Sequence, residues 1–175
     1  VYESTETTHY SIVDEAGNAA SVTTTLNLGY GSGVTVPGAG FLLNDEMDDF
    51  AAKPGSPNAY GLVQGEANSV APGKRMLSSM TPSIVVGPDG DLRMVVGTPG
   101  GSTIITSVYH VISNVIDHQL SLAEAVAAPR VHHQALPDVV FFESGGLSPE
   151  VVGALEEMGY TGMERESLSG GIAAI

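Results

Sequence analysis

The chain has 175 residues, 42% of them hydrophobic, which is enough for a single domain with one sizeable core. Its formal net charge of -14, with only six Lys and Arg residues, repels phosphate backbones and anionic lipid, so neither nucleic acid nor a membrane surface is an expected partner. The absence of Cys excludes a disulfide framework, a thiolate nucleophile and a zinc-thiolate site, and no apolar run reaches the roughly 18 residues of a transmembrane helix.

The first predicted element is a β-hairpin with one polar face. The segment TTHYSIVD alternates, which places Thr7 and His9 on one face, and after the turn DEAGN the segment AASVTTTLN alternates again, with Thr25 and Asn27 on its polar face. Threonines at a strand start are usually ordinary strand residues. A threonine hydroxyl becomes a nucleophile when a base lies beside it, and the α-amino group of an N-terminal threonine is one such base. The pattern alone leaves both interpretations open.

Two Gly-rich loops follow, and then FLLN, residues 41–44, is predicted to be a short strand that runs into an acidic segment. This segment, DEMDDF, places Asp45, Glu46, Asp48 and Asp49 within five residues, a concentration of negative charge that suits an ammonium group or a cation. It lacks the Gly and the closing Glu of an EF-hand loop, so no metal site is predicted. The alternative is a solvated acidic loop, followed by a second loop, KPGSPNAYG.

A second hairpin is predicted from SIVV, the turn GPDGD and LRMVVG, and both arms are apolar enough for central strands. Just before it, KRMLSSMTP sets Ser78 and Ser79 beside basic residues, a combination that can receive a carboxylate. Just after it, TPGGSTII sets Gly100 and Gly101 before a helix, where free N–H groups and the helix dipole favour an anion or an oxyanion. A plain Gly-rich turn is the alternative.

Three helices and a last strand complete the prediction. Apolar residues from Ile104 to Ile116 recur at helical spacing, SLAEAVAAP begins with a Ser cap and stops at Pro129, and SPEVVGALEEMGY runs from a Ser-Pro-Glu start to Gly159. The chain then reaches GGIAAI, which is predicted to be a strand. Four histidines are interpreted as structural: His110, His118, His132 and His133.

Taken in order, TTHYSIVD, TLN, LLNDEMDDF, PNAYG, KRMLSSMTPSIVV, GTPGGSTIIT and APRVHHQ resemble the small subunit of the gamma-glutamyltranspeptidase family over nearly all of residues 7–172. The resemblance implies an α+β fold, a four-layer αββα sandwich of the N-terminal-nucleophile hydrolase type, completed by a large subunit that is cut from the same precursor and is not present in this chain. It also implies that residues 1–6 are a residual pro-segment upstream of a self-cleavage site at Glu6-Thr7. Residues 7–175 are then the catalytic small-subunit domain, truncated at its C-terminal end.

The resemblance assigns catalytic roles to four residues. Thr7 corresponds to the nucleophile, with its own α-amine as base, and Thr25 to the threonine that orients its hydroxyl. Gly100 and Gly101 correspond to the amides of the oxyanion hole.

Six further residues correspond to the substrate-binding set of the family. Asn27, Glu46 and Asp49 are then the residues that hold the α-amino group of the donor, and Ser78 and Ser79 hold its α-carboxylate. The tyrosine that closes over the bound glutamyl group in bacterial members corresponds to Tyr60.

The implied activity is that of a glutathione hydrolase and gamma-glutamyltransferase. Glutathione and other γ-glutamyl compounds are the expected donors, water and amino acids or dipeptides the expected acceptors, and no cofactor or metal is required. Bacterial members are usually periplasmic or secreted. Two alternatives remain open: a cephalosporin (glutaryl) acylase of the same fold, whose donor lacks the α-amino group, and an unprocessed, catalytically silent binding homologue.

Overall fold

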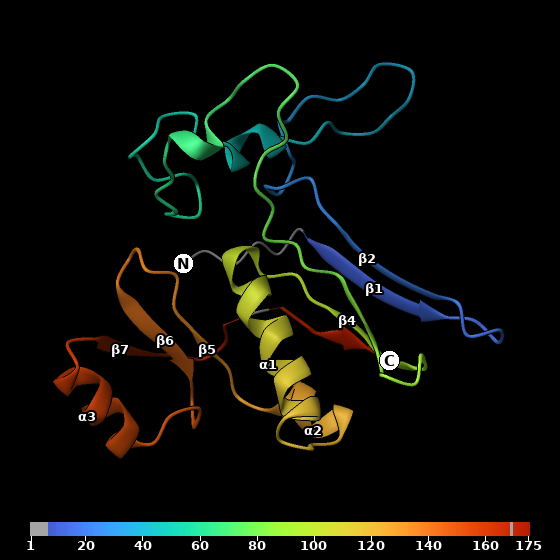
Figure 1. Ribbon diagram of the computed structural model, residues 1–175. Coiled ribbons are helices and arrows are strands. Elements are labelled where there is room, and N and C mark those ends of the chain that lie inside the picture. Colours follow the sequence, from blue (N-terminus) through green and yellow to red (C-terminus); the bar gives the residue numbers. More distant parts are fainter. Residues whose placement is uncertain (1–6, 169) are drawn as a thin grey trace.

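The computed structural model describes residues 7–168 and 170–175, so the predicted pro-segment, residues 1–6, lies outside the described residues. Three small sheets form in this part of the chain, with strand orders β1-β2, β3-β4-β8 and β5-β6-β7. Three α-helices accompany them, and a long irregular segment lies above the N-terminal end of the first helix, α1 (Figure 1). The architecture is α+β, as the sequence predicts.

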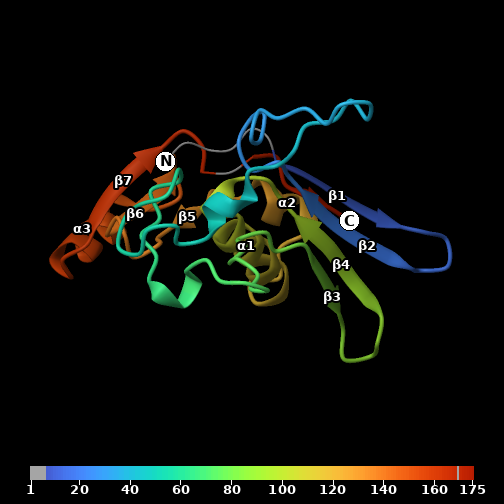
Figure 2. The same cartoon turned by 90° about the horizontal axis from the view of Figure 1, so that it is seen from above.

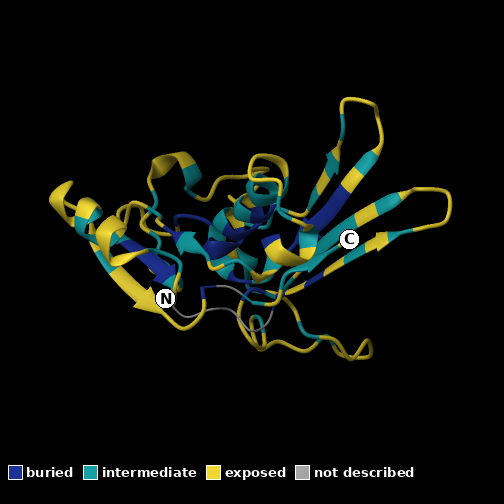
Figure 3. Cartoon of the chain, turned by 90° about the horizontal axis from the view of Figure 1, so that it is seen from below, coloured by how far each residue is buried: buried dark blue, intermediate teal, exposed yellow. Residues whose placement is uncertain are grey.

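The first predicted hairpin is confirmed as β1 (Thr8–Val13) and β2 (Ala19–Thr24), an antiparallel pair. Its polar face points inward, since His9 is buried. The apolar face points outward, with Tyr10 44% and Ile12 52% exposed (Figure 3). The nucleophile candidate therefore stands at the head of a strand whose polar side chains face the protein interior.

The second hairpin consists of β3 (Ser83–Val86) and β4 (Leu92–Gly97), and β8 (Ala173–Ala174) pairs with the free side of β4. The prediction of a central strand is correct for β4 and wrong for β3, which lies at the sheet edge with Ile84 and Val86 about half exposed. Apolar composition reveals a strand but does not reveal how many neighbours it has. The final predicted strand, in GGIAAI, is confirmed as β8.

A hydrophobic core joins β4 to α1 (Ile104–Ile116) and α2 (Leu122–Ala127). Met94 and Val96 of β4 pack against apolar residues of the helices: Ile104, Val108, Val111 and Ala125. Because side chains alternate along a strand, Val95 and Gly97 face the opposite side, toward the β1-β2 hairpin. The layers are thus helices, the β3-β4-β8 sheet, and the β1-β2 hairpin, and Figure 2 shows the two hairpins side by side.

The third sheet was not predicted. It consists of β5 (Val131–His132), β6 (Val139–Glu143) and β7 (Thr161–Arg165), and the parallel pair β6-β7 is connected through α3 (Pro149–Glu157). The helix itself was predicted from its Ser148 cap, whose hydroxyl accepts the Val151 N–H. This βαβ unit lies beside α1 (Figure 1).

Between β2 and β3 the chain is mostly irregular, with two single-turn 3-10 helices, η1 (Glu46–Asp49) and η2 (Glu66–Asn68). The predicted strand at residues 41–44 is wrong: that segment makes one isolated bridge, between Thr35 and Leu42, because only the preceding loop lies beside it. No helix in the described part of the chain is long and apolar enough to cross a membrane.

Candidate functional site

One pocket gathers the predicted site residues between the irregular segment and the N-terminal end of α1. Of the ten predicted residues, all but Gly100 line it: Thr7, Thr25, Asn27, Glu46, Asp49, Tyr60, Ser78, Ser79 and Gly101. Four lining residues were not singled out in the sequence: Leu62, Met80, Ser102 and Ile104. The enclosed space is about 30 Å³, which suits a water molecule rather than an amino acid. A wider and more open pocket of about 440 Å³ adjoins it and shares Thr25, Glu46, Asp49, Ser78 and Met80, so a larger ligand has room to extend into this space.

Thr7 is the first described residue, and its side chain is almost completely buried at 8% exposure. Its hydroxyl donates a hydrogen bond to Thr25 Oγ1 at 3.1 Å. The same oxygen accepts the Asn27 backbone N–H at 2.9 Å, which holds the Thr25 side chain in place. The Thr7 hydroxyl is therefore oriented by a residue that is itself fixed.

Asn27 enters the pocket because the backbone turns sharply after β2. Its φ is +75°, in the left-handed region that asparagine tolerates better than most residues. The side chain is 4% exposed, and its amide donates a hydrogen bond to the backbone carbonyl of Asp45 at 3.4 Å. The end of β2 is thereby connected to the acidic segment.

The acidic segment forms η1, and the turn separates its four carboxylates into two pairs. Glu46 and Asp49 line the pocket. Asp45 and Asp48 instead accept backbone N–H groups, those of Leu28 at 3.0 Å and Ala59 at 3.2 Å. Two of the four carboxylates are therefore available to a ligand, and the other two hold the loop.

Burial disfavours the charged form of both carboxylates in the pocket, while a hydrogen bond from Glu46 partly offsets this effect at Asp49. Burial, with Asp49 and Asp45 nearby, raises the pKa of Glu46 to about 7. Burial also raises the pKa of Asp49. Because two close carboxylates resist simultaneous ionisation, a bound ammonium group would allow both to carry charge and would be held by both.

The Gly100-Gly101 loop leads from β4 into η3 (Gly101–Thr103), which continues directly into α1. Both glycines have positive φ, +142° and +56°, a conformation in which a side chain would be strained. The Gly100 carbonyl accepts the backbone N–H of Thr103 at 3.1 Å and its hydroxyl at 2.8 Å. Amides at a helix N-terminus have no intrahelical acceptor and carry the positive end of the dipole, so this loop suits an oxyanion.

Tyr60 forms the roof of the pocket. Its hydroxyl lies 2.9 Å from Asn27 Oδ1 and 3.1 Å from the Asn27 carbonyl oxygen, both acceptors. Its ring covers Gly101 so closely that a Cβ at that glycine would lie 3.3 Å from two ring carbons. Tyr60 therefore spans the pocket from the end of β2 to the glycine loop.

Ser78 and Ser79 lie on the wall of the pocket, just before β3. The Ser78 hydroxyl oxygen accepts the Met80 N–H at 3.2 Å. Met80 and Leu62 add apolar surface beside these polar groups, which the sequence does not predict. The position of Met80 directly after the serine pair was the available signal.

His132, interpreted as structural, supports the pocket from behind. It is 3% exposed, and its ring nitrogens lie 2.9 Å from Thr106 Oγ1 and 2.9 Å from Gln134 Oε1. The same Gln134 oxygen accepts the hydroxyl of Ser102 at 2.8 Å. The first turn of the helix at the glycine loop is thus connected to the segment that contains β5. No group of three His, Asp or Glu side chains suited to a metal occurs among the described residues.

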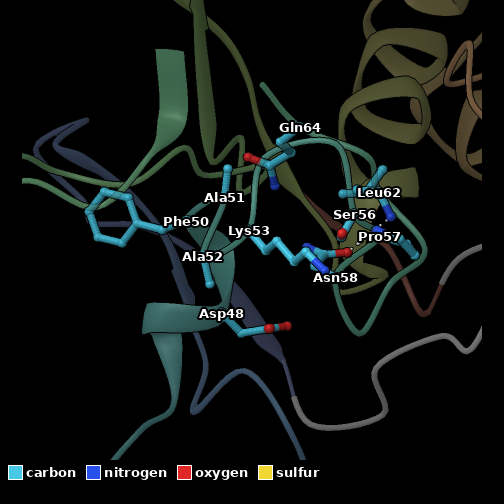
Figure 4. Close-up of a pocket in the computed structure, with 10 residues that line it drawn as sticks. All are labelled: Asp48, Phe50, Ala51, Ala52, Lys53, Ser56, Pro57, Asn58, Leu62 and Gln64. Carbon is cyan, nitrogen blue, oxygen red and sulfur yellow. Dashed lines mark hydrogen bonds between the residues drawn. The ribbon is translucent and has the colours of Figure 1, made fainter. Parts of the chain in front are cut away.

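Another pocket, of about 110 Å³, is lined by residues between Asp48 and Gln64 (Figure 4). Asp48, Lys53 and Asn58 contribute polar groups to its wall. It contains neither Thr7 nor the glycine loop, so it has no nucleophile paired with an oxyanion site. The first pocket is therefore the candidate active site.

Comparison with known proteins gives a consistent result. The family model described as "Gamma-glutamyltranspeptidase" matches residues 1–175. The chain is 56% identical over 172 residues to the glutathione hydrolase proenzyme of Pseudomonas aeruginosa, covering 97% of this chain and 31% of the relative. It is 56% identical over 158 residues to that of Escherichia coli, covering 90% of this chain and 27% of the relative. The chain thus spans about 30% of the length of these curated relatives.

Solved structures extend the comparison to the fold. The gamma-glutamyltranspeptidase of Pseudomonas nitroreducens complexed with L-DON has a TM-score of 0.83 at 56% identity, covering 96% of this chain and 88% of that chain. A mutant of the Helicobacter pylori gamma-glutamyltranspeptidase has a TM-score of 0.88 at 52% identity, covering 96% and 89%. A cephalosporin acylase of Bacillus halodurans has a TM-score of 0.71 at 25% identity, covering 89% and 26%. The fold is the α+β fold of the N-terminal-nucleophile hydrolases, and the chain belongs to the gamma-glutamyltranspeptidase family.

Proposed function

We propose that this chain is the catalytic portion of a γ-glutamyl acyltransferase and hydrolase that acts on glutathione and other γ-glutamyl compounds. The observation that carries the proposal is the single pocket in which the Thr7 hydroxyl, an amide-bearing glycine loop and the Glu46-Asp49 pair meet. These three parts correspond to the three needs of the reaction: a nucleophile, an oxyanion site and an anchor for an α-ammonium group.

In the proposed reaction, Thr7 Oγ1 attacks the γ-carbonyl carbon of the donor. The α-amino group of Thr7, free once the Glu6-Thr7 bond has been cut, takes the hydroxyl proton and passes it to the departing amine. The tetrahedral oxyanion is stabilised by the amides of Gly100 and Gly101. Water or the amine of an amino acid or dipeptide then attacks the γ-glutamyl ester and releases Thr7.

The donor is held at both ends of its amino-acid group. Asn27, Glu46 and Asp49 bind the α-ammonium, and the hydroxyls of Ser78 and Ser79 bind the α-carboxylate. The side-chain methylenes of the donor then lie against Leu62 and Met80. The remainder of the protein supplies a large subunit that completes the site, and a periplasmic or secreted location stays a prediction.

The nearest rival is a glutaryl acylase, favoured by the structural likeness to the Bacillus halodurans cephalosporin acylase. A glutaryl donor has no α-ammonium, so Glu46 and Asp49 would be buried in the pocket without a partner charge. Isolated buried carboxylates are costly. The γ-glutamyl donor is therefore the better match.

The decisive experiment expresses this chain together with the upstream region of its precursor and compares γ-glutamyl-p-nitroanilide with glutaryl-p-nitroanilide. We expect release of p-nitroaniline from the γ-glutamyl substrate and at least ~10-fold lower kcat/KM with the glutaryl substrate, since a charge-assisted contact contributes roughly 1.5 to 3 kcal/mol. Preference for the glutaryl substrate would support the acylase, and inactivity on both would support a silent homologue.

A further inference from the structure

A polar layer between two sheets connects the nucleophile strand to the strand that leads to the glycine loop. His9 lies on the inward face of β1, the face of Thr7, and is 9% exposed. The neighbouring inward hydroxyls bind backbone carbonyls of the other sheet: Ser11 donates to Ala173 at 3.2 Å, and Ser21 donates to Val96 at 3.3 Å. The hairpin is therefore attached to β4 and β8 through side chains on this face.

The hydrogen bonds of His9 define its tautomer. Its Nδ1 lies 2.8 Å from Thr23 Oγ1, and its Nε2 lies 3.1 Å from Ser11 Oγ. Because the Ser11 hydroxyl proton is donated to Ala173, Nε2 must carry a proton and donate to Ser11, and Nδ1 accepts from Thr23. Burial lowers the pKa of His9, which keeps the ring neutral. Both ring nitrogens are thus occupied, and the ring has no free group for acid-base chemistry.

This ring lies against β4 at Gly97. A Cβ added to Gly97 would lie 2.2 Å from His9 Cε1 and 2.3 Å from its Nδ1, closer than real atoms approach. The φ of Gly97 is not positive, so its backbone conformation would accept a side chain. The glycine is needed here for space alone. Because the ring is buried and held at both nitrogens, it cannot swing aside for a methyl group.

We propose that the His9-Gly97 contact sets the distance between the nucleophile and the oxyanion loop, which makes His9 a positioning residue. The contact lies two residues after Thr7 on β1 and three residues before Gly100 on the strand that enters the loop. A rigid ring between the two backbones therefore determines how far the Thr7 hydroxyl stands from the amides of Gly100 and Gly101. This inference rests on the proposed acyl transfer at Thr7.

The effect should be on turnover rather than on donor binding. The groups that would hold the donor, Asn27, Glu46, Asp49, Ser78 and Ser79, are not among the hydrogen-bond partners of His9, which are Thr23 and Ser11. A misplacement of about 1 Å between reacting groups costs roughly 100-fold in rate, and loss of one oxyanion donor costs roughly 100- to 1000-fold. We therefore expect changes at this contact to lower kcat and leave KM nearly unchanged.

The test uses the full precursor with four changes: His9→Gln, His9→Ala, Gly97→Ala, and His9→Ala combined with Gly97→Ala. His9→Gln keeps polar atoms for Thr23 and Ser11 but replaces the rigid ring with a flexible chain. The double variant places the methyl group in the space that the ring vacates. Matched controls are His118→Gln, an exposed histidine, and Gly153→Ala, where an added Cβ meets nothing within 4 Å.

Two rates are measured on each variant: self-cleavage of the precursor by intact mass, and kcat and KM with γ-glutamyl-p-nitroanilide. For His9→Gln and Gly97→Ala we expect both rates to fall about 10- to 100-fold with KM within threefold of wild type. The double variant should recover part of the self-cleavage rate and of the kcat that Gly97→Ala loses. Both control variants should have the rates of wild type.

The inference is overturned if the folded His9→Gln protein keeps both rates within twofold of wild type. It is also overturned if every fall in kcat is accompanied by a comparable rise in KM. Failure of Gly97→Ala to fold leaves the decision to His9→Gln and the double variant. Self-cleavage needs no γ-glutamyl substrate. A wild-type precursor that cleaves itself but does not hydrolyse the anilide would contradict the proposed substrate. The self-cleavage rates of the variants would then still test the role of the His9-Gly97 contact. A wild-type precursor that shows neither reaction overturns both proposals.

Discussion

Raised pKa values at Glu46 and Asp49 make the predicted ammonium site sensitive to pH. The pKa of Glu46 is raised to about 7, mainly by burial. An ammonium ligand favours the ionised pair, so binding should release a proton below this pH. Donor affinity is thereby coupled to a group that titrates in the physiological range.

The first prediction follows from this coupling. In wild type, KM for a γ-glutamyl donor should fall as pH rises from 6 to 8, because Glu46 loses its proton and both carboxylates attract the ammonium. Glu46→Gln should flatten this dependence of KM. The rise of kcat with pH should remain, since the N-terminal amine of Thr7 is still the proposed base.

Thermal unfolding of the same two proteins gives an independent check. A carboxyl whose folded pKa is raised stabilises the fold below its unfolded pKa, near 4.5, and this stabilisation is lost as pH rises to about 7. Glu46→Gln should therefore raise Tm relative to wild type at pH 8 and have a smaller effect at pH 4.5. An equal shift of Tm at both pH values would contradict the raised pKa.

The second prediction separates the four clustered acids. Asp49→Ala should raise KM for a γ-glutamyl donor at least ~10-fold more than for a glutaryl analogue, because the lost charge-assisted contact to the ammonium is worth roughly 1.5 to 3 kcal/mol. Asp48→Ala is the matched control, since its carboxylate accepts the Ala59 N–H instead of lining the donor pocket. Steady-state kinetics with both donors decides the matter, and equal losses on the two donors would refute the ammonium role.

At the scale of elements, the roof segment and the glycine loop are held together by one side chain. Tyr60 joins them through its hydroxyl, near Asn27, and through its ring, over Gly101. The pocket beneath encloses only about 30 Å³. Tyr60 therefore restricts the space over Gly101, and we expect it to shift when a donor carbonyl reaches the glycine loop.

The third prediction concerns that closure. Tyr60→Phe keeps the ring over Gly101 but removes the hydroxyl, so the closed roof loses a net ~0.5 to 1.5 kcal/mol. We expect donor KM to change by no more than about tenfold, with faster dissociation of a bound inhibitor in stopped-flow measurements. Tyr30→Phe, at a tyrosine that is 77% exposed, is the control. An unchanged dissociation rate would mean that the Tyr60 hydroxyl does not hold the roof.

The sequence predicted elements whose signals are local. The helix α1 is recognisable from its apolar spacing, and α2 and α3 from Ser121 and Ser148, which cap them as the sequence indicates. The strand β5 has only two residues, and β6 is a continuous apolar run whose partner β7 lies beyond α3, so neither shows alternation. The edge position of β3 likewise depends on where β8 pairs, which no local pattern reveals.

The same distinction applies to the site. The candidate residues were predictable because the family resemblance supplied them, and the structure brings nine of the ten to one pocket. The charge pattern alone could not tell which of the four neighbouring acids enter the pocket, because the turn of η1 decides it; the family resemblance selected Glu46 and Asp49. The sequence also could not reveal the His9-Gly97 contact, since these residues belong to different sheets.

At the scale of the whole molecule, the outer face of the β1-β2 hairpin is exposed although it carries Tyr10 and Ile12. The curated relatives are about three times as long as the part that this chain matches. Both facts agree with a larger partner subunit from the same precursor. The activity is therefore best tested in the precursor and not in this chain alone.

The fourth prediction is that the precursor cuts itself at Glu6-Thr7 through the Thr7 hydroxyl, which forms an ester with the Glu6 carbonyl that water then cleaves. Thr7→Ala should remain one polypeptide and be inactive. Thr8→Ala should still cut, since Thr8 is exposed on the opposite face of β1. Intact-mass measurement of the three precursors distinguishes them, and cleavage of Thr7→Ala at the same bond would exclude this mechanism.

The pairing of β4 with β8 also bears on when the proposed self-cleavage can occur during synthesis. Ser11 binds the carbonyl of Ala173, 162 residues further along the chain, and Gly97 pairs with the same residue. Translation proceeds at about 5 to 20 residues per second, so on the order of ten seconds or more separate the synthesis of Thr7 from that of β8. During this interval the nucleophile exists but the sheet behind its oxyanion loop is incomplete. If the precursor cuts itself as proposed, we therefore expect scission only after β8 has been synthesised.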